Sequence, residues 1–340
     1  MHGFIPKWPC SMHPRIATLA PMKNAKRIAL ALLALVALCA TVLGVVGIET
    51  TSHPHQPSAL GNPRPLTDVL AALNEPGPVE LETITSADWA VERSGLINLN
   101  HPTAKAAGLT ADDEPIHVFF HALRHPTKGL FIVDTGVETA LRDAPRKAAV
   151  RGIVASALKL EENMKMHEPL GTWLAKQPQP LAGVFLTHLH MDHILGMSDV
   201  PSGTPVYAGP GETSPRSFLN VLVKPVTDRA LEGKAPISEW DYRPETRGDF
   251  EGAVDIFGDG SVWALWVPGH TPGSTAYLVR STKGPVLLLG DACHTRWGWE
   301  HDVEPGTFTS DAPKGVESFK KLRAFAHAHP QVVVRMGHQH

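Results

Sequence analysis

The chain is short of cysteine and has no excess of positive charge, and each shortage excludes a class of protein. Only three of its 340 residues are cysteine, and Cys10 and Cys39 lie near the N-terminus. Cys293 is therefore alone in the rest of the chain, which excludes a disulfide framework there. We expect it to be a small buried hydrophobic residue. The formal net charge of -3 gives no sign of the basic surface that nucleic-acid binding requires, so we predict a small-molecule substrate and no nucleic-acid partner.

Histidine, in contrast, is abundant, and a short run gathers several metal-ligating residue types. Residues 187–193 read Thr-His-Leu-His-Met-Asp-His and directly follow an apolar, strand-like segment. Imidazole and carboxylate groups suit Zn²⁺ and similar divalent ions. On an extended backbone, alternate residues point the same way, so His188, His190 and Asp192 would share one side. His193 would turn aside, and one loop could then serve two adjacent metal ions. A polar loop that faces solvent is the alternative.

Further candidate ligands follow other apolar segments. Each comes directly after a strand-like run: His270 after residues 263–267, Asp291 after 285–289 and His338 after 332–334. Ligands on strand ends are held more rigidly than ligands on free loops, so we expect one rim built from several strand ends. His340 is a second candidate near the C-terminus. We favour His338 because it directly follows the strand and Gly337.

This set of residues resembles the ligand pattern of the metallo-β-lactamase superfamily over about residues 117 to 340. The resemblance implies an α+β fold, a four-layer αββα sandwich, and two divalent metal ions with Zn²⁺ as the expected species. It assigns the ligands as follows: His188, His190 and His270 to the first ion, Asp192, His193 and His338 to the second, and Asp291 to both. It also includes Asp134, in a turn after residues 131–133, where we expect support beside His188.

The implied chemistry is hydrolysis. Two such ions can share a water molecule and lower its pKa, so no serine or cysteine nucleophile is required. Asp192 could orient that water and pass its proton to the leaving group, which makes it a catalytic candidate too. The motifs at 267–274 and 288–292 are most similar to those of the N-acyl homoserine lactonases, which implies a lactone or another ester-like substrate. That group usually carries a Tyr three residues after the bridging Asp. Here the position is His294, our second catalytic candidate, because imidazole also donates hydrogen bonds.

Other functions stay open from the sequence. A β-lactamase or a thioester hydrolase could use the same scaffold, and a redox enzyme with a single non-haem iron or a non-catalytic metal-binding protein are further alternatives. The complete set of second ligands, Asp192, His193 and His338, argues against a single iron. Four apolar side chains could wall a pocket for an acyl chain or simply cover the core: Met166, Trp297, Trp299 and Phe308.

The N-terminal region is a separate feature. Residues 28–48 are 21 consecutive residues without a charge, and at about 1.5 Å per residue such a helix would cross a hydrocarbon core of about 30 Å. Basic residues precede this segment, which places residues 1–27 in the cytoplasm. We predict a membrane anchor with the catalytic domain outside the cytoplasm, in the periplasm, or a secreted protein if the segment is a cleaved signal peptide. A start at Met22 would make residues 1–21 a mis-assigned extension.

The remaining chain divides into a linker and one domain. Residues 49–66 are rich in Pro, Ser, His and Gly and are predicted to be a linker. Residues 67–340 are predicted to be a single catalytic domain, because candidate ligands spread from 188 to 338 must come together in one fold. The periodicity predicts strands at 79–84, 89–92, 117–125, 129–133 and 183–186, and helices at 66–73, at about 150–158 and from Ala312 to before Pro330.

Three more histidines alternate along one predicted strand. His117, His121 and His125 would share one face of the segment 117–125. We expect that face to be solvated, opposite Val118 and Phe120, and a second metal cluster is the less favoured alternative.

Overall fold

The computed structural model describes residues 27–34, 36, 47–71, 73, 76–243 and 250–340. The chain divides into two compact units, Met1–Val46 and Gly47–His340. In the first unit, residues 27–34 and 36 are helical and exposed. Within the described ranges, no helix combines the length and the apolar character that a bilayer crossing needs. Residues 35 and 37–46 of the predicted anchor lie outside those ranges, as do residues 1–26, so the anchor stays a prediction.

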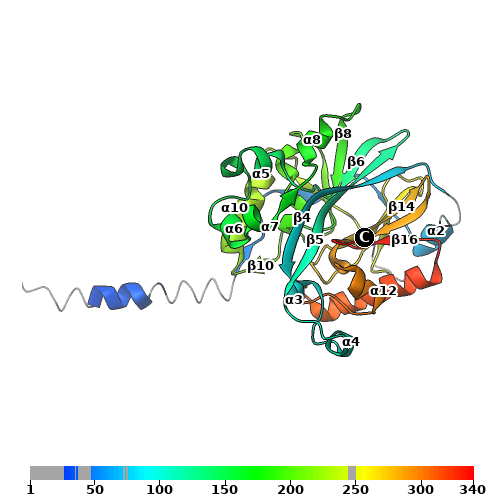
Figure 1. The fold of residues 1–340 in the computed structure, drawn as a ribbon. Helices are drawn as coiled ribbons and strands as arrows, with labels where there is room; N and C mark the ends of the chain where they lie inside the picture. The colour runs from blue at the N-terminus through cyan, green and yellow to red at the C-terminus, as the bar shows by residue number, and fades with distance from the viewer. Residues whose placement is uncertain (1–26, 35, 37–46, 72, 74–75, 244–249) are drawn as a thin grey trace, which may run out of the picture. The chain divides into compact units, whose positions relative to one another are not determined.

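The second unit contains an eight-stranded mixed sheet (Figure 1). Its strands in spatial order are β2 (His55–Pro57), β11 (Ile237–Glu239), β9 (Val206–Ala208), β8 (Leu181–Phe185), β6 (Gly129–Val133), β5 (Asp113–His125), β4 (Glu80–Glu92) and β7 (Lys165–Met166). The first five strands in this order, β2, β11, β9, β8 and β6, are parallel to one another. The pairs β6–β5, β5–β4 and β4–β7 are antiparallel. The two predicted strands 79–84 and 89–92 are one strand, β4, with an irregularity between Thr85 and Ala87.

A six-stranded sheet faces the first. Its strands in order are β16 (Val333–Arg335), β15 (Gly284–Leu288), β14 (Thr275–Ser281), β13 (Val262–Trp266), β12 (Ala253–Asp255) and β3 (Asn62–Pro63). All neighbours are antiparallel except β15 and β16, which are parallel. A further two-stranded ribbon joins β1 (Ile48–Glu49) to β10 (Arg216–Ser217).

The main core lies between the two large sheets. Phe185 on β8 stacks on Phe131 of β6 with ring centroids 5.0 Å apart, and Tyr277 of the second sheet stacks on Phe185 at 5.9 Å. The Tyr277 hydroxyl also donates a hydrogen bond to the carbonyl of Leu186 at 2.8 Å. This bond fixes the end of β8 against the opposite sheet, directly before the histidine-rich motif.

Helices cover the outer face of each sheet. The helical segments are α2 (Leu66–Ala71), α3 (Arg93–Leu96), α4 (Pro102–Ala106), α5 (Thr139–Asp143), η1 (Pro145–Lys147), α6 (Ile153–Ala157), α7 (Leu160–Asn163), α8 (Leu170–Leu174), α9 (Met191–Ile194), η2 (Met197–Asp199), α10 (Asn220–Ala230), η3 (Gly290–Ala292), α11 (Arg296–Glu300) and α12 (Ala312–Ala328). Figure 1 shows α12 beside the sheet that holds β14 and β16, and α8 beside β6 and β8. The second unit is therefore the expected four-layer αββα sandwich.

Helix α12 shows how the sequence specifies one of these outer layers. Asp311 caps it by accepting a hydrogen bond from the backbone N–H of Lys314 at 3.1 Å. Phe319, Leu322 and Phe325 recur at helical spacing and are buried against the second sheet. Burial of each such side chain stabilises the fold by about 1.5–3 kcal/mol, so this face fixes the helix over β14 and β15.

Three expectations differ from the structure. Residues predicted as a linker form β2 and β3 and part of β1, which pair with strands of the second unit; these strands are too short to show a periodicity. The predicted helix at 150–158 is reduced to α6, in which Ile153 is 76% exposed. His121 and His125 are buried, not solvated, because Thr83 and Asp259 supply hydrogen-bond partners at 2.8 and 2.9 Å.

Candidate metal centre

Three histidines from two loops converge on one point. His188 and His190 follow β8, and His270 lies in the loop after β13. The Nε2 atom of His270 lies 2.8 Å from Nδ1 of His190 and 3.1 Å from Nε2 of His188. Burial lowers the pKa of all three imidazoles, so each is neutral near pH 7 and has a ring nitrogen available to a metal ion. These residues are the first donor group.

Asp192, His193 and His338 form a second donor group, and Asp291 joins it to the first. The Nε2 atom of His338 lies 3.3 Å from a carboxylate oxygen of Asp192 and 3.3 Å from Oδ1 of Asp291. The Nε2 atom of His193 lies 3.3 Å from Oδ2 of Asp291. The same Oδ2 is 3.4 Å from Nε2 of His270. The structure thus brings together all seven residues that the sequence singled out as ligands.

The chemistry of this cluster fits divalent cations. Two ligands that bind one tetrahedral zinc ion at about 2.0–2.1 Å lie roughly 3.3 Å from each other, which matches the spacings around Asp291. The Nε2 atom of His193 is buried without a hydrogen-bond partner in the described part of the chain. Three sets of side chains in that part have the residue types and spacing of a metal site. The sets are His188, His190 and His270; Asp192, His193, Asp291 and His338; and His270, Asp291 and His294.

Asp192 and Asp291 form ion pairs with the imidazoles of the second donor group, and these ion pairs shift the pKa values of both partners. Burial alone would raise the pKa of Asp291, but the neighbouring His338 and other histidines lower it well below the usual range. Burial likewise acts against the charge on His338, yet Asp291 and Asp192 raise the pKa of that imidazole to about 10. Since a metal binds the deprotonated ligand, metal binding there would release a proton.

Asp134 supports the second donor group from the end of β6. Its φ of 56° is in the left-handed region, which a short polar side chain tolerates. Its carboxylate accepts hydrogen bonds of 2.8 Å from the backbone N–H of Thr187 and from Nδ1 of His193, so Nε2 of His193 is left to face Asp291. We expected this support beside His188. The parallel pairing of β6 with β8 places Asp134 next to the start of the motif, and the ring that reaches it comes from α9.

Glu212, which belongs to none of the sequence motifs, connects the two loops of the first donor group. Its carboxylate is 1% exposed and accepts 2.8 Å hydrogen bonds from the backbone N–H groups of Leu189 and Gly273 and a further one from the hydroxyl of Thr271. Leu189 lies between the first two histidines of the motif, and Thr271 follows His270. Burial raises the pKa of Glu212 to about 7. Because two of its three partners are backbone groups, no residue pattern would have revealed this role.

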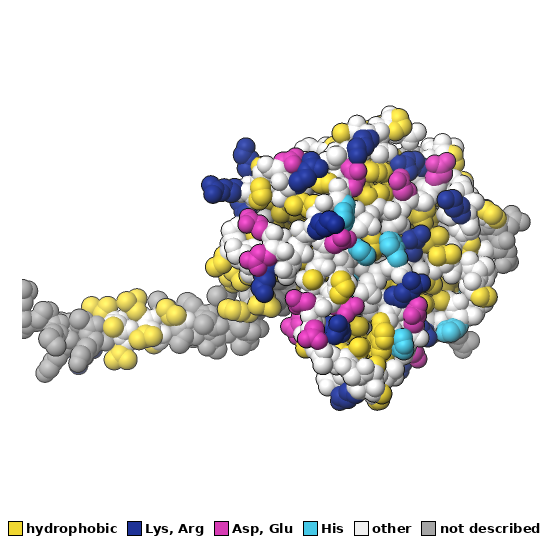
Figure 2. Space-filling model, viewed as in Figure 1, with side chains coloured by type: hydrophobic (Ala, Val, Ile, Leu, Met, Phe, Trp, Pro, Cys, Tyr) yellow, Lys and Arg dark blue, Asp and Glu magenta, His cyan; other side chains and the backbone are white. Residues whose placement is uncertain are grey.

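The C-terminal strand positions His338 and leaves His340 outside the cluster. The Nδ1 atom of His338 donates to the backbone carbonyl of His117 at 2.9 Å. Gly337 permits the close approach, because a Cβ there would lie 2.2 Å from Oδ1 of Asp291. His340 is exposed. Figure 2 shows histidine side chains, in cyan, on the viewed face near the C-terminus. Lys and Arg side chains are interspersed among Asp and Glu on the same face.

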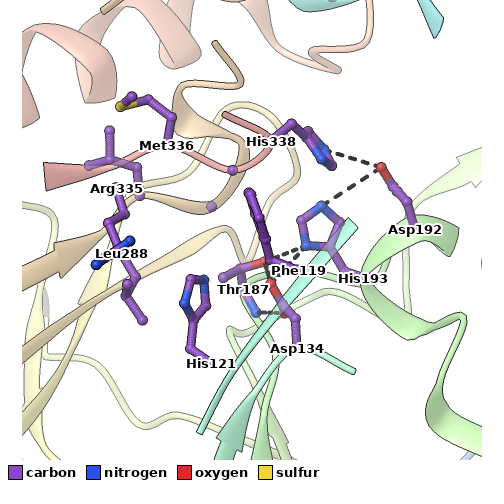
Figure 3. A pocket seen from close by; sticks show the side chains of 13 residues that line it. Phe119, His121, Asp134, Thr187, Asp192, His193, Leu288, Arg335, Met336 and His338 are labelled. Carbon is purple, nitrogen blue, oxygen red and sulfur yellow. Dashed lines mark hydrogen bonds and ion pairs between the residues drawn. The ribbon is translucent and has the colours of Figure 1, made fainter. Parts of the chain in front are cut away.

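A small cavity adjoins the second donor group. Figure 3 shows Asp192, His193 and His338 linked by ion pairs, with Asp134 and Thr187 next to His193. The cavity measures about 10 Å³, which is enough for roughly one water molecule.

Apolar side chains lie beside the motif, although not the complete wall that the sequence suggested. Met166 and Trp297 belong to one apolar cluster together with Met191, a residue of the motif itself. Trp299 packs instead on Phe319 of α12 with ring centroids 6.0 Å apart. Phe308 is 46% exposed.

A larger cavity of about 460 Å³ lies among α5, η1, α6, α7 and β7, and Met166 is one of the residues that line it.

The residues after Asp291 complete the site. Cys293 is 1% exposed, and burial raises the pKa of its thiol to about 12, which agrees with the expected buried, unreactive side chain. His294 is also 1% exposed, and its Nε2 atom lies 3.3 Å from Oδ2 of Asp291.

Comparison with known proteins gives a consistent result. A family model described as the metallo-beta-lactamase superfamily matches residues 116–338. Among curated proteins, the chain is 30% identical over 223 residues to the N-acyl homoserine lactonase AttM of Azorhizobium caulinodans, which covers 63% of this chain and 79% of that protein. It is 31% identical over 174 residues to the gamma-lactamase MBL2 of Gibberella moniliformis, which covers 48% of this chain and 70% of that protein.

Solved structures agree in fold. One is an N-acyl homoserine lactone hydrolase with the product N-hexanoyl-L-homoserine bound at its catalytic metal centre; the TM-score is 0.53 at 20% identity, over 77% of this chain and 94% of that one. Another is AidC, described as a dizinc quorum-quenching lactonase, with a TM-score of 0.52 at 15% identity, over 83% and 92% of the two chains. At these identities the likeness concerns the fold alone.

Proposed function

Because the chain belongs to the metallo-beta-lactamase superfamily, we propose that it is a dinuclear metal-dependent hydrolase that opens the ring of a lactone. The observation that carries this proposal is the Asp291 carboxylate, which faces His270 of the first donor group and both His193 and His338 of the second at 3.3–3.4 Å. A shared carboxylate between two donor groups is the arrangement that a pair of ions requires. Two complete groups also argue against a single-iron redox enzyme.

The residues have distinct roles in this proposal. The first donor group and the second donor group would each hold one divalent ion, with Zn²⁺ as the expected species, and Asp291 would serve both groups. The bound ions would lower the pKa of a water molecule and polarise the substrate carbonyl. Asp192 is the most exposed member of the second group, with 21% of its side chain accessible. It can therefore accept a proton from the attacking water and return it to the leaving alcohol. Asp134 keeps the His193 ring in the required tautomer.

The substrate class is argued from the relatives and from the apolar surroundings. The curated relative AttM is an N-acyl homoserine lactonase. Met166 and Trp297 pack, partly buried, against the same apolar cluster as Met191 of the motif, and such side chains suit an acyl substituent. A cyclic amide is the second candidate, since another curated relative is a gamma-lactamase and the same donor groups would serve ring opening of a lactam.

The decisive experiment combines metal analysis with ring-opening assays on the purified full-length chain. We expect two Zn²⁺ per chain by elemental analysis and acid release from N-hexanoyl and N-decanoyl homoserine lactones, which a pH indicator follows. Removal of metal with a chelator should abolish turnover, and His188→Ala should prevent loading of the first ion. A γ-lactam and a thioester of the same acyl chain complete the panel. A metal-loaded protein that opens neither lactone nor lactam would refute the proposal.

We further propose that residues 28–48 anchor the protein in a membrane with the second unit outside the cytoplasm. Support comes from the uncharged run of 21 residues and the basic residues before it. Fractionation of cells that express the full chain, followed by protease treatment of intact spheroplasts, tests this. Membrane-bound protein that external protease digests is the expected result; protein found only in the cytosol would refute it.

A further inference from the structure

His294 occupies an unusual environment for a histidine. It follows η3, three residues after Asp291, and is 1% exposed. Neither of its ring nitrogens has a hydrogen-bond partner among the residues that the structure describes. Burial of an unpaired polar group costs roughly 1–3 kcal/mol, so a buried imidazole with both nitrogens unpaired needs a physical explanation.

The position of the ring supplies that explanation. The Nε2 atom of His294 lies 3.3 Å from Oδ2 of Asp291, and the same oxygen is 3.4 Å from Nε2 of His270. Donor atoms of His270, Asp291 and His294 all lie within 4.8 Å of one another. A spacing of about 3.3 Å is expected between two ligands of one zinc ion, and the predicted ligands His193 and Asp291 show the same distance.

We propose that His294 is an additional metal ligand, which binds the ion of the first donor group together with His270 and Asp291. This inference rests on the proposed function, because it assumes that the site holds metal. The alternative is that His294 donates a hydrogen bond to the substrate. Its Nε2 atom faces the Asp291 carboxylate at the centre of the cluster, within reach of an ion that His270 and Asp291 would hold, and this geometry favours the ligand role.

His294 would give the first ion a ligand from a third segment of the chain. His188 and His190 come from one loop and His270 from another, whereas His294 follows the short buried turn η3 after β15. The extra imidazole would tighten binding of this ion and occupy one of its coordination positions. Metal affinity, and not only turnover, should therefore depend on residue 294.

The test measures metal binding by the full-length protein with His294→Ala and His294→Gln, and His340→Ala serves as the control. His340 is a nearby histidine that is exposed and outside the cluster. Competition with a chromophoric chelator gives the Zn²⁺ affinities, and the visible spectrum of the Co²⁺-loaded protein reports the ligands. We expect both His294 variants to lose affinity for one ion by at least the roughly 10- to 100-fold that loss of an outer partner costs. Their Co²⁺ spectra should change, whereas His340→Ala should match the wild type.

A rescue experiment separates ligation from a packing role. Imidazole added to His294→Ala should restore the wild-type Co²⁺ spectrum, because it can enter the space left by the ring. The Gln variant keeps most of the side-chain volume, so it remains informative if the Ala variant folds poorly. Variants with wild-type Zn²⁺ affinity and Co²⁺ spectrum but lower turnover would overturn the proposal in favour of substrate contact. A wild-type protein that binds no metal at all would instead overturn the proposed function.

Discussion

Glu212 provides the sharpest test of how the first donor group is held. The change Glu212→Ala removes the acceptor of two backbone N–H groups, those of Leu189 and Gly273, and of the Thr271 hydroxyl. Each buried donor left without an acceptor costs roughly 1–3 kcal/mol. Thr271 can redirect its hydroxyl to Ser274, 2.7 Å away, so the two N–H groups dominate. We expect Glu212→Ala to lower the free energy of unfolding by about 2–6 kcal/mol, a large part of the roughly 5–15 kcal/mol of a typical domain.

Glu212→Gln should have a smaller effect. The amide keeps one acceptor oxygen and the side-chain volume, but its NH₂ group would face one of the donors. We expect a loss of about 1–3 kcal/mol, the cost of one buried donor without an acceptor.

The assay is urea unfolding of the full chain, followed by circular dichroism with chelator present and again with Zn²⁺. The destabilisation should be larger with Zn²⁺, because the loops that carry His188, His190 and His270 would no longer be held together for binding. Glu239→Gln is the matched control. The side chain of Glu239 is half-buried and accepts one backbone hydrogen bond, from Gly211 at 3.1 Å. Loss of this hydrogen bond should lower the free energy of unfolding by about 1 kcal/mol or less. Equal unfolding free energies for wild type and Glu212→Ala would refute the reasoning.

Three further predictions address other parts of the second unit. Asp134→Asn should weaken binding of one metal ion about 10- to 100-fold, because the carboxylate no longer orients His193; chelator competition measures this, and an unchanged affinity would contradict it. Burial raises the pKa of Glu138 to about 7, so the folded state retains a proton that the unfolded chain releases. The contribution of this carboxyl group to stability is therefore complete below about pH 4.5 and is lost as the pH rises through 7. The unfolding free energy of Glu138→Gln relative to wild type should therefore rise by up to about 3 kcal/mol between pH 5 and 8, and parallel pH profiles in urea titrations would count against it. Gly209→Ala would place a Cβ 1.7 Å from the backbone oxygen of Gly273, so we expect a strongly lowered melting temperature or insoluble protein, and a wild-type melting curve would show that the loops can separate freely.

The donor groups could be predicted from sequence because their signals are local. His188, His190 and Asp192 are brought together by a spacing within one loop, and each distant partner directly follows an apolar strand. Strand ends of a sandwich meet at one rim, so Asp291 and His338 could be placed without knowing the register of the sheets. The same argument could not decide whether Asp134 contacts His193 or His188, because the choice depends on how β6 lies against β8.

The predictions that were wrong concern features that depend on residues far away in the sequence. The burial of His121 and His125 depends on Thr83 from β4 and on Asp259 from the loop before β13, which the alternation along one strand does not reveal. When those partners are unknown, a strand face with several histidines is predicted to be exposed to solvent. The short strands at residues 48–63 have too few residues to alternate, and β2 and β3 each contain a proline, so only their pairing partners identify them.

The two donor groups are supported in different ways, and this difference gives His294 a physical purpose. The second group is fixed by Asp134 at the end of β6 and by a backbone carbonyl that accepts from His338. The first group comes from two loops that the buried carboxylate of Glu212 joins. Ligands on rigid elements hold their geometry better than ligands on loops. An imidazole from His294, directly after β15 and η3, would attach the first ion to a third and firmly packed element, which compensates for the weaker support of its other ligands.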